Sequence, residues 1–136
     1  MKLVLAGFIL AASCASAQAV TFTGKATVQD GDTIYVDHQA IRLFGVDAEE
    51  LSEPHGVRAK YAMRALINGA TLTCVADGAS YSRVVARCYF ANGVELNQSI
   101  ISSGWALDCK HYSGGIYRQY EAPGARARLI QKPYCK

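Results

Sequence analysis

The chain has 136 residues, and its 14 lysine and arginine residues against 11 acidic residues give a formal net charge of +3. This length predicts one domain, with room for a single hydrophobic core of modest size. The mildly basic charge permits a nucleic acid as partner but does not by itself indicate one. The sequence shows no internal repeat, low-complexity tract or linker.

The first 19 residues have the composition of an export signal. Lys2 gives a positive start, residues 3–12 are apolar or small, and Ala15-Ser16-Ala17 fits cleavage by signal peptidase. The apolar run is shorter than the roughly 18 residues of a membrane-spanning helix. We therefore expect a signal peptide over residues 1–19, cleaved after about residue 17 to 19, and one exported domain over residues 20–136. Periplasmic and secreted locations both agree with this, and no membrane span is expected.

The chain has five cysteines. Cys14 could carry a lipid, but the preceding Ala11-Ala12-Ser13 is a poor lipoprotein signal, so loss of Cys14 with the signal is favoured. Four cysteines then remain, at positions 74, 88, 109 and 135. Because an exported protein meets oxidising conditions, we expect disulfides. A zinc site is disfavoured, because the sequence has no Cys-x-x-Cys pair and few histidines.

The predicted secondary structure begins with three strands joined by tight turns. The strands cover Thr21–Gln29, Thr33–Val36 and Ala40–Val46. Turn signals separate them at Asp30-Gly31 and at Asp37-His38-Gln39. Three consecutive strands with such short connections predict an antiparallel meander.

The apolar residues then change to a helical period over Gly56–Asn68. Two further strands are predicted over Thr71–Ala76 and Arg83–Phe90, with a polar loop between them, and a short helix follows over Val94–Ser103. The segment Tyr117–Ile130 has helical composition, but an internal Pro-Gly pair must kink or break it. Five strands with a helix after the third predict a β-barrel with helices (α+β), arranged as a five-stranded OB-fold.

The predicted hairpin bears on the disulfides. Cys74 and Cys88 lie on consecutive strands and could face each other across them. Of the three possible pairings, this favours Cys74–Cys88, which leaves Cys109–Cys135 to hold the C-terminus.

Three charged motifs lie near the ends of the predicted strands. Asp30-Gly31-Asp32-Thr33 is a common kind of turn that places Asp32 at the start of a strand. The segment 42–50 places Arg42 in an otherwise apolar strand and Asp47, Glu49 and Glu50 at its end. Tyr81-Ser82-Arg83 precedes another apolar strand. Taken singly, each motif is equally compatible with a solvated turn or loop.

Together with Gly104-Trp105-Ala106, these motifs resemble the thermonuclease family, typified by staphylococcal nuclease. The family pattern runs Asp-Gly-Asp-Thr, Arg-Leu-x-Gly-x-Asp-x-x-Glu, Tyr-x-Arg and Gly-x-Ala, and its order and spacing match from about Thr23 to Ala106. The segment 108–135 looks like a cysteine-bearing bacterial branch of that family. The resemblance implies a monomeric, calcium-dependent endonuclease. Its substrate would be DNA, with RNA left open, and single strands would be preferred.

The resemblance also implies residue roles that agree with the chemistry of phosphodiester hydrolysis. Arg42 and Arg83 would be the catalytic arginines, since guanidinium groups stabilise charge on phosphoryl oxygens. Asp32 and Asp47 would bind Ca²⁺ through oxygen, with a backbone carbonyl completing the shell. Glu50 occupies the position of the family's general base. Glu49 replaces the usual proline, which leaves open whether it competes with Glu50 for that role.

Substrate contacts are expected from Tyr81, Lys110 and Tyr112. Lys110 stands where the staphylococcal type has a base-stacking tyrosine, and Tyr112 retains the other position. The alternative function is a non-catalytic OB-fold module that only binds nucleic acid. Retention of all five charged site residues argues against that alternative.

Overall fold

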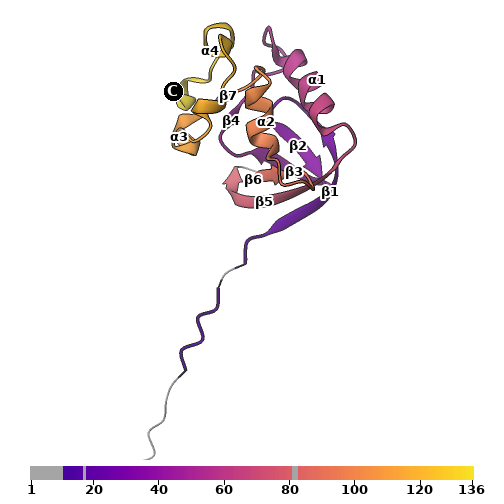
Figure 1. Ribbon diagram of the computed structural model, residues 1–136, viewed down its shortest axis with the longest axis vertical. Helices are drawn as coiled ribbons and strands as arrows, with labels where there is room; N and C mark the ends of the chain where they lie inside the picture. Colours follow the sequence, from indigo (N-terminus) through magenta and orange to yellow (C-terminus); the bar gives the residue numbers. More distant parts are fainter. Residues whose placement is uncertain (1–10, 17, 81–82) are drawn as a thin grey trace, which may run out of the picture.

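The structure is a computed structural model that describes residues 11–16, 18–80 and 83–136. Five strands form a closed barrel in the order β1-β2-β3-β6-β5, with helices packed on it (Figure 1). The barrel strands are β1 (Thr21–Val28), β2 (Thr33–Val36), β3 (Gln39–Leu43), β5 (Thr71–Ser80) and β6 (Arg83–Tyr89). The five-stranded OB-fold expected from the sequence is thereby confirmed.

Alternation of side chains forms the barrel wall. Along β1, every second residue from Phe22 to Val28 is half-buried, and the threonines and lysine between them are exposed. The neighbours of β1 are both antiparallel, with β2 on one edge and β5 on the other. The barrel closes through a parallel pairing of β3 with β6, which sets Arg42 opposite Val85. This closure brings the end of β3 and the start of β6 together.

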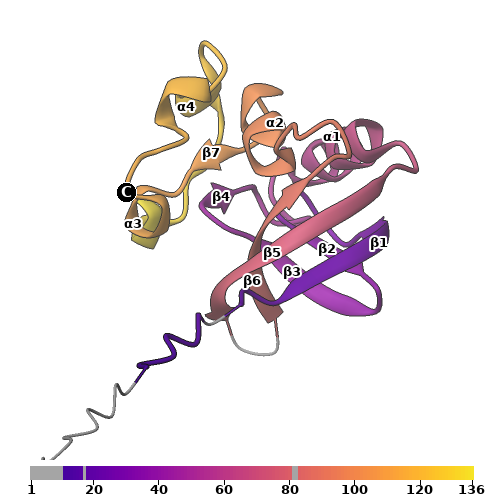
Figure 2. The same ribbon diagram turned by 60° about the horizontal axis from the view of Figure 1, so that its bottom comes forward.

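Helices α1 (Gly56–Ile67) and α2 (Leu96–Ser102) cover the barrel core and lie side by side in Figures 1 and 2. Helix α1 buries Ala59, Met63 and Ile67, which are four residues apart and so share one face. It ends where Asn68 adopts a left-handed conformation with φ of 42°. The loop that precedes this helix runs from the end of β4 (Val46–Asp47).

That region differs from the sequence prediction, because the third strand does not continue to Val46. It ends at Leu43, and Gly45 turns the chain with φ of +70°. A Cβ at Gly45 would lie 2.8 Å from the Cβ of Ser113, so only glycine fits. The chain then forms β4 (Val46–Asp47), which pairs with β7 (Leu107–Asp108) outside the barrel. Another difference is that β5 extends past Ala76 to Ser80, with a register shift on the way.

The C-terminal part consists of short helical turns, as expected for a helix interrupted by a Pro-Gly pair. They are α3 (Lys110–Ser113), η1 (Arg118–Tyr120), α4 (Ala125–Arg128) and η2 (Pro133–Cys135). In Figures 1 and 2 these turns lie beside β4 and β7, next to the barrel. Both disulfides that the sequence favoured are present, Cys74–Cys88 between β5 and β6 and Cys109–Cys135 between β7 and the C-terminus. The C-terminus is thus held against the end of β7.

Most of the predicted export signal cannot be compared, since residues 1–10 and 17 lie outside the described residues. In the part of the chain that the structure does describe, no helix is both long and apolar enough to cross a bilayer.

Asn97 joins α2 to the barrel and is fully buried. Its Oδ1 accepts a hydrogen bond from the Cys88 N–H at 3.0 Å, and its Nδ2 donates to the carbonyls of Phe44 and Ala86. We expect Asn97→Ala to lower the free energy of unfolding by about 2–4 kcal/mol, because it leaves buried backbone groups unpaired. Guanidinium denaturation measures this. The exposed Asn92→Ala, as control, should cost less than about 1 kcal/mol, and equal losses would contradict the role given to Asn97.

Candidate active site

The turn before β2 points Asp32 into the protein. Asp30 Oδ1 accepts hydrogen bonds from the N–H groups of Asp32 and Thr33 at 3.1 and 2.9 Å, which closes the turn. A Cβ at Gly31 would lie 2.6 Å from the Ala48 Cβ, so glycine is needed for the turn to pack this closely. Burial, reinforced by the charge of Asp32, raises the pKa of Asp30 to about 6. Asp32 itself is only 2% exposed.

Arg42 lies on β3, opposite Thr33 of β2, and forms an ion pair with Asp32. Its Nη2 also donates to the Val46 carbonyl at 3.0 Å, so two contacts hold the guanidinium plane. Burial alone would lower the pKa of Arg42, but the Asp32 carboxylate raises it above its ordinary value. The guanidinium is therefore charged and held in one orientation.

Arg83 begins β6 and reaches the same region from the neighbouring strand. Its Nη1 donates to the Thr33 hydroxyl at 3.3 Å, next to Asp32 in the chain. Arg42 and Arg83 both line an open pocket of about 530 Å³, and Glu50 lies on the same pocket. The structure thus brings together the two arginines and the glutamate that the sequence singled out.

The neighbouring residues Glu49 and Glu50 have different environments. Glu49 is 3% exposed, and its Oε1 accepts a hydrogen bond from the backbone N–H of His55 at 3.1 Å. Its Oε2 accepts one from the Ile130 N–H and lies 2.8 Å from His55 Nδ1. Burial would raise the pKa of Glu49, but these hydrogen bonds outweigh it and lower the pKa. The Glu50 side chain, by contrast, is 54% exposed and open to solvent.

The loop that carries both glutamates is fixed by the first residue of α1. A Cβ at Gly56 would lie 1.8 Å from the Glu50 carbonyl oxygen, so the helix start and the loop touch at the backbone. The Glu50 N–H donates to Glu53 Oε1 at 2.7 Å, which orders the same turn. The backbone of the loop at Glu50 is therefore held by the packing of α1.

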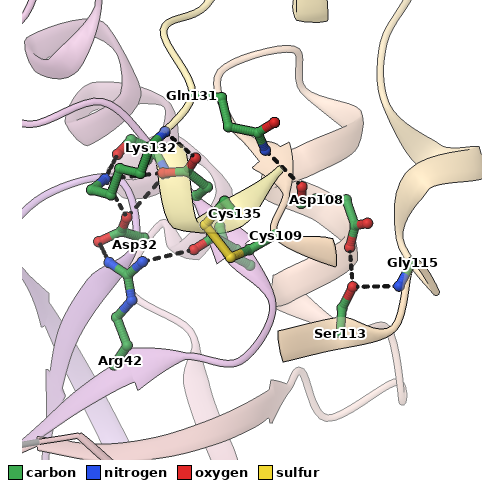
Figure 3. The surroundings of a disulfide bond; sticks show 12 residues. Asp32, Arg42, Asp108, Cys109, Ser113, Gly115, Gln131, Lys132 and Cys135 are labelled. Carbon is green, nitrogen blue, oxygen red and sulfur yellow. Dashed lines mark hydrogen bonds and ion pairs between the residues drawn. A yellow bond between two sulfur atoms is a disulfide. The ribbon is translucent and has the colours of Figure 1, made fainter. Parts of the chain in front are cut away.

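Lys132, in the C-terminal segment, also reaches this site, and none of the sequence motifs predicted it. Figure 3 shows its side chain among the acidic residues, beside Asp32 and above Arg42. Its Nζ lies 2.9 Å from Asp47 Oδ1 and 2.8 Å from the Ala48 carbonyl oxygen, to which it donates hydrogen bonds. It also lies 3.3 Å from Glu50 Oε1 and 3.9 Å from Asp32 Oδ2. The only signal in the sequence is that Lys132 precedes Cys135 by three residues.

The charges in this cluster affect one another. Burial would lower the pKa of Lys132, but the carboxylates of Asp32 and Asp47 raise it, so the ammonium stays protonated. Burial raises the pKa of Asp47, and the ammonium offsets only part of that rise. For the pKa of Asp47, burial thus outweighs the effect of the neighbouring ammonium.

The oxygens around the Lys132 ammonium are hard ligands of the kind that bind calcium. They come from three carboxylates and one backbone carbonyl, and they already surround a positive charge. No group of three histidine, cysteine or acidic side chains in the described residues is arranged as a metal site. The oxygens are thus of the chemical type that a hard cation prefers, but they are arranged around an ammonium, which supplies the positive charge.

The predicted substrate contacts are not all at this pocket. Tyr112 lines it and is 60% exposed, and Tyr134, which the sequence reasoning missed, lines it beside Tyr112 with the ring centroids 6.2 Å apart. Lys110 lines a second pocket, of about 400 Å³, with Arg118 and Arg126. Tyr81 lies outside the described residues.

Known proteins resemble this chain over more than half of its length. Residues 40–132 match the model of a family described as staphylococcal nuclease homologue. The chain is 31% identical over 126 residues to the succinoglycan biosynthesis protein ExoI of Rhizobium meliloti (strain 1021), covering 84% of this chain and 65% of that protein. It is also 31% identical over 98 residues to an uncharacterized endonuclease of Escherichia coli, covering 68% of this chain and 59% of the relative. The chain thus spans less than two thirds of the length of these relatives.

Proposed function

Because the chain belongs to the family of staphylococcal nuclease homologues, we propose that it is an endonuclease that hydrolyses phosphodiester bonds of DNA, and of RNA as a second substrate. The observation that carries the proposal is the open pocket on which Arg42, Arg83 and Glu50 meet. The name of the Escherichia coli relatives, uncharacterized endonuclease, points the same way.

The two arginines would bind and polarise the scissile phosphate. A guanidinium carries five N–H donors, and Arg42 uses one on Asp32 and one on Val46. Arg83 uses one on Thr33. Donors therefore remain on both residues for the phosphoryl oxygens, whose negative charge grows as the bond to water forms.

Glu50 would accept the proton of the attacking water. Its carboxylate is open to solvent at the pocket, whereas both oxygens of Glu49 are engaged by His55 and Ile130. This difference in environment supports Glu50 over Glu49 as the general base. Glu49 would instead hold the loop and the C-terminal segment in place.

Asp32, Asp47 and the Ala48 carbonyl would hold a divalent cation, calcium by family resemblance, when Lys132 is displaced. The bound cation would neutralise phosphate charge and make nearby water more acidic. Tyr112 and Tyr134 present exposed aromatic rings at the pocket, and such rings stack on unpaired bases. This supports a preference for single-stranded substrate.

Export is part of the proposal. Two disulfides are typical of proteins that fold outside the reducing cytosol. They agree with a cleaved signal peptide over residues 1–19 and a single exported domain that follows it. Mass spectrometry of the protein recovered from outside the cytoplasm tests the cleavage site, and an intact residue Met1 would contradict it.

Cleavage of labelled single-stranded DNA by the purified chain, in calcium and then in chelator, tests the function. We expect Glu50→Gln to lower the cleavage rate by about 10²-fold or more, as for loss of a general base, with DNA affinity unchanged. Asp37→Asn, on the exposed turn between β2 and β3, is the matched control and should cleave normally. DNA binding without cleavage in any divalent metal would favour the binding module instead.

A further inference from the structure

The C-terminal segment from Leu129 to Cys135 forms a strap over the loop that carries the acidic residues. The Ile130 N–H donates to Glu49 Oε2 at 3.2 Å, and the Lys132 N–H donates to Asp47 Oδ2 at 3.0 Å. Farther out, Gln131 Nε2 donates to the Asp108 carbonyl at 2.9 Å (Figure 3). The strap is thus anchored to the site by two backbone N–H groups that donate to carboxylates, in addition to the contacts of the Lys132 ammonium.

The Cys109–Cys135 disulfide fastens the end of this strap. It joins the strap to the residue that follows β7, and both cysteines are 1% exposed. Because Lys132 lies only three residues before Cys135, the disulfide keeps its ammonium near the acidic cluster. The effective concentration of that ammonium at the cluster is therefore high.

The ammonium takes the central position among the oxygens. Its Nζ is within 3 Å of Asp47 Oδ1 and the Ala48 carbonyl, and the Lys132 side chain is 18% exposed. A calcium ion would need the same two oxygens at about 2.3–2.6 Å. Two cations cannot share that space, so one must leave before the other binds.

We propose that Lys132 is a built-in competitor of the divalent cation, so that the strap holds the site in a metal-free state until the metal displaces the ammonium. This inference rests on the proposed function for the identity of the site. Binding then requires the strap or its lysine side chain to move out of the cluster. The apparent metal affinity is therefore the intrinsic affinity multiplied by the fraction of time that Lys132 spends outside the cluster. Free calcium concentration thereby sets how much of the protein is open to substrate.

Calorimetric titration of calcium into the purified chain, with no nucleic acid present, tests the competition. We expect Lys132→Met to tighten calcium binding by at least about tenfold, because the side chain keeps most of its length and loses its charge. Lys136→Met, one residue beyond the disulfide and exposed, should bind calcium as the unmodified chain does. Equal affinity in all three proteins, weaker binding in Lys132→Met, or no calcium binding at all would overturn the proposal.

Chemical labelling of the unmodified chain gives a second readout that does not depend on how the variant folds. In chelator, acetic anhydride should acetylate Lys132 more slowly than Lys136, and saturating calcium should raise the rate at Lys132 alone. An unchanged rate at Lys132 would overturn the proposal. Since neither measurement uses DNA, a chain that shows competition without cleaving DNA would contradict only the proposed nuclease function.

Discussion

Replacement of Arg42 by lysine should lower kcat/KM for single-stranded DNA by about 10²- to 10³-fold, the usual cost of losing one donor to transition-state charge. Lysine keeps the charge but offers a single ammonium. The Arg42 guanidinium can pair with Asp32, donate to the Val46 carbonyl and still donate to a phosphate. A lysine ammonium at this position cannot make all three contacts at once. The measurement is initial-rate kinetics at saturating calcium.

Stability distinguishes a catalytic from a structural loss in this experiment. A lysine at position 42 still places a cation beside the buried Asp32, so thermal denaturation should change little compared with the loss of rate. Arg58→Lys, on the exposed face of α1, is the matched control and should alter neither quantity. Cleavage by Arg42→Lys within twofold of the unmodified rate would show that Arg42 does not meet the reacting phosphate.

The barrel and the first half of the site could be predicted from sequence because their signals are local. Alternation along β1 and turn residues such as Asp30-Gly31 specify strands and their connections. Once the barrel is assumed, β2, β3 and β6 must be neighbours, and the residues at their ends must meet. The resemblance to the thermonuclease family singled out Asp32, Arg42 and Arg83, and this order of strands explains why they lie close together.

The environments of Glu49 and Lys132 could not be predicted in this way. The contact from Ile130 to Glu49 spans 81 residues, and that from Lys132 to Asp47 spans 85. Both depend on the path of a C-terminal segment made of short turns, which has no periodicity to read. The sequence showed two adjacent glutamates, but only their packing against α1 and the strap separates the buried one from the exposed one.

The C-terminal strap also connects the site with the Cys109–Cys135 disulfide. Cys74–Cys88 and Cys109–Cys135 are both buried, but only the second fastens residues that touch the acidic cluster. The two bonds should therefore contribute similarly to stability and differently to metal binding. Loss of the Cys109–Cys135 bond is therefore expected to change both the free energy of unfolding and the calcium affinity.

Removal of the second bond by Cys109→Ala with Cys135→Ala should lower the free energy of unfolding by about 3.5 kcal/mol, as estimated from the loop entropy of its 26-residue separation. It should also tighten calcium binding, because the freed strap no longer holds Lys132 in the cluster. Guanidinium denaturation and calorimetry measure the two effects.

Cys74→Ala with Cys88→Ala is the matched control for that double variant. Its 14-residue separation predicts a loss of about 3 kcal/mol, close to the other, but the bond lies between β5 and β6, away from the strap. Its calcium affinity should stay unchanged at temperatures where the barrel is folded. If both double variants bound calcium equally, the disulfide would be only a structural fastening and the strap would reach the acidic cluster without it.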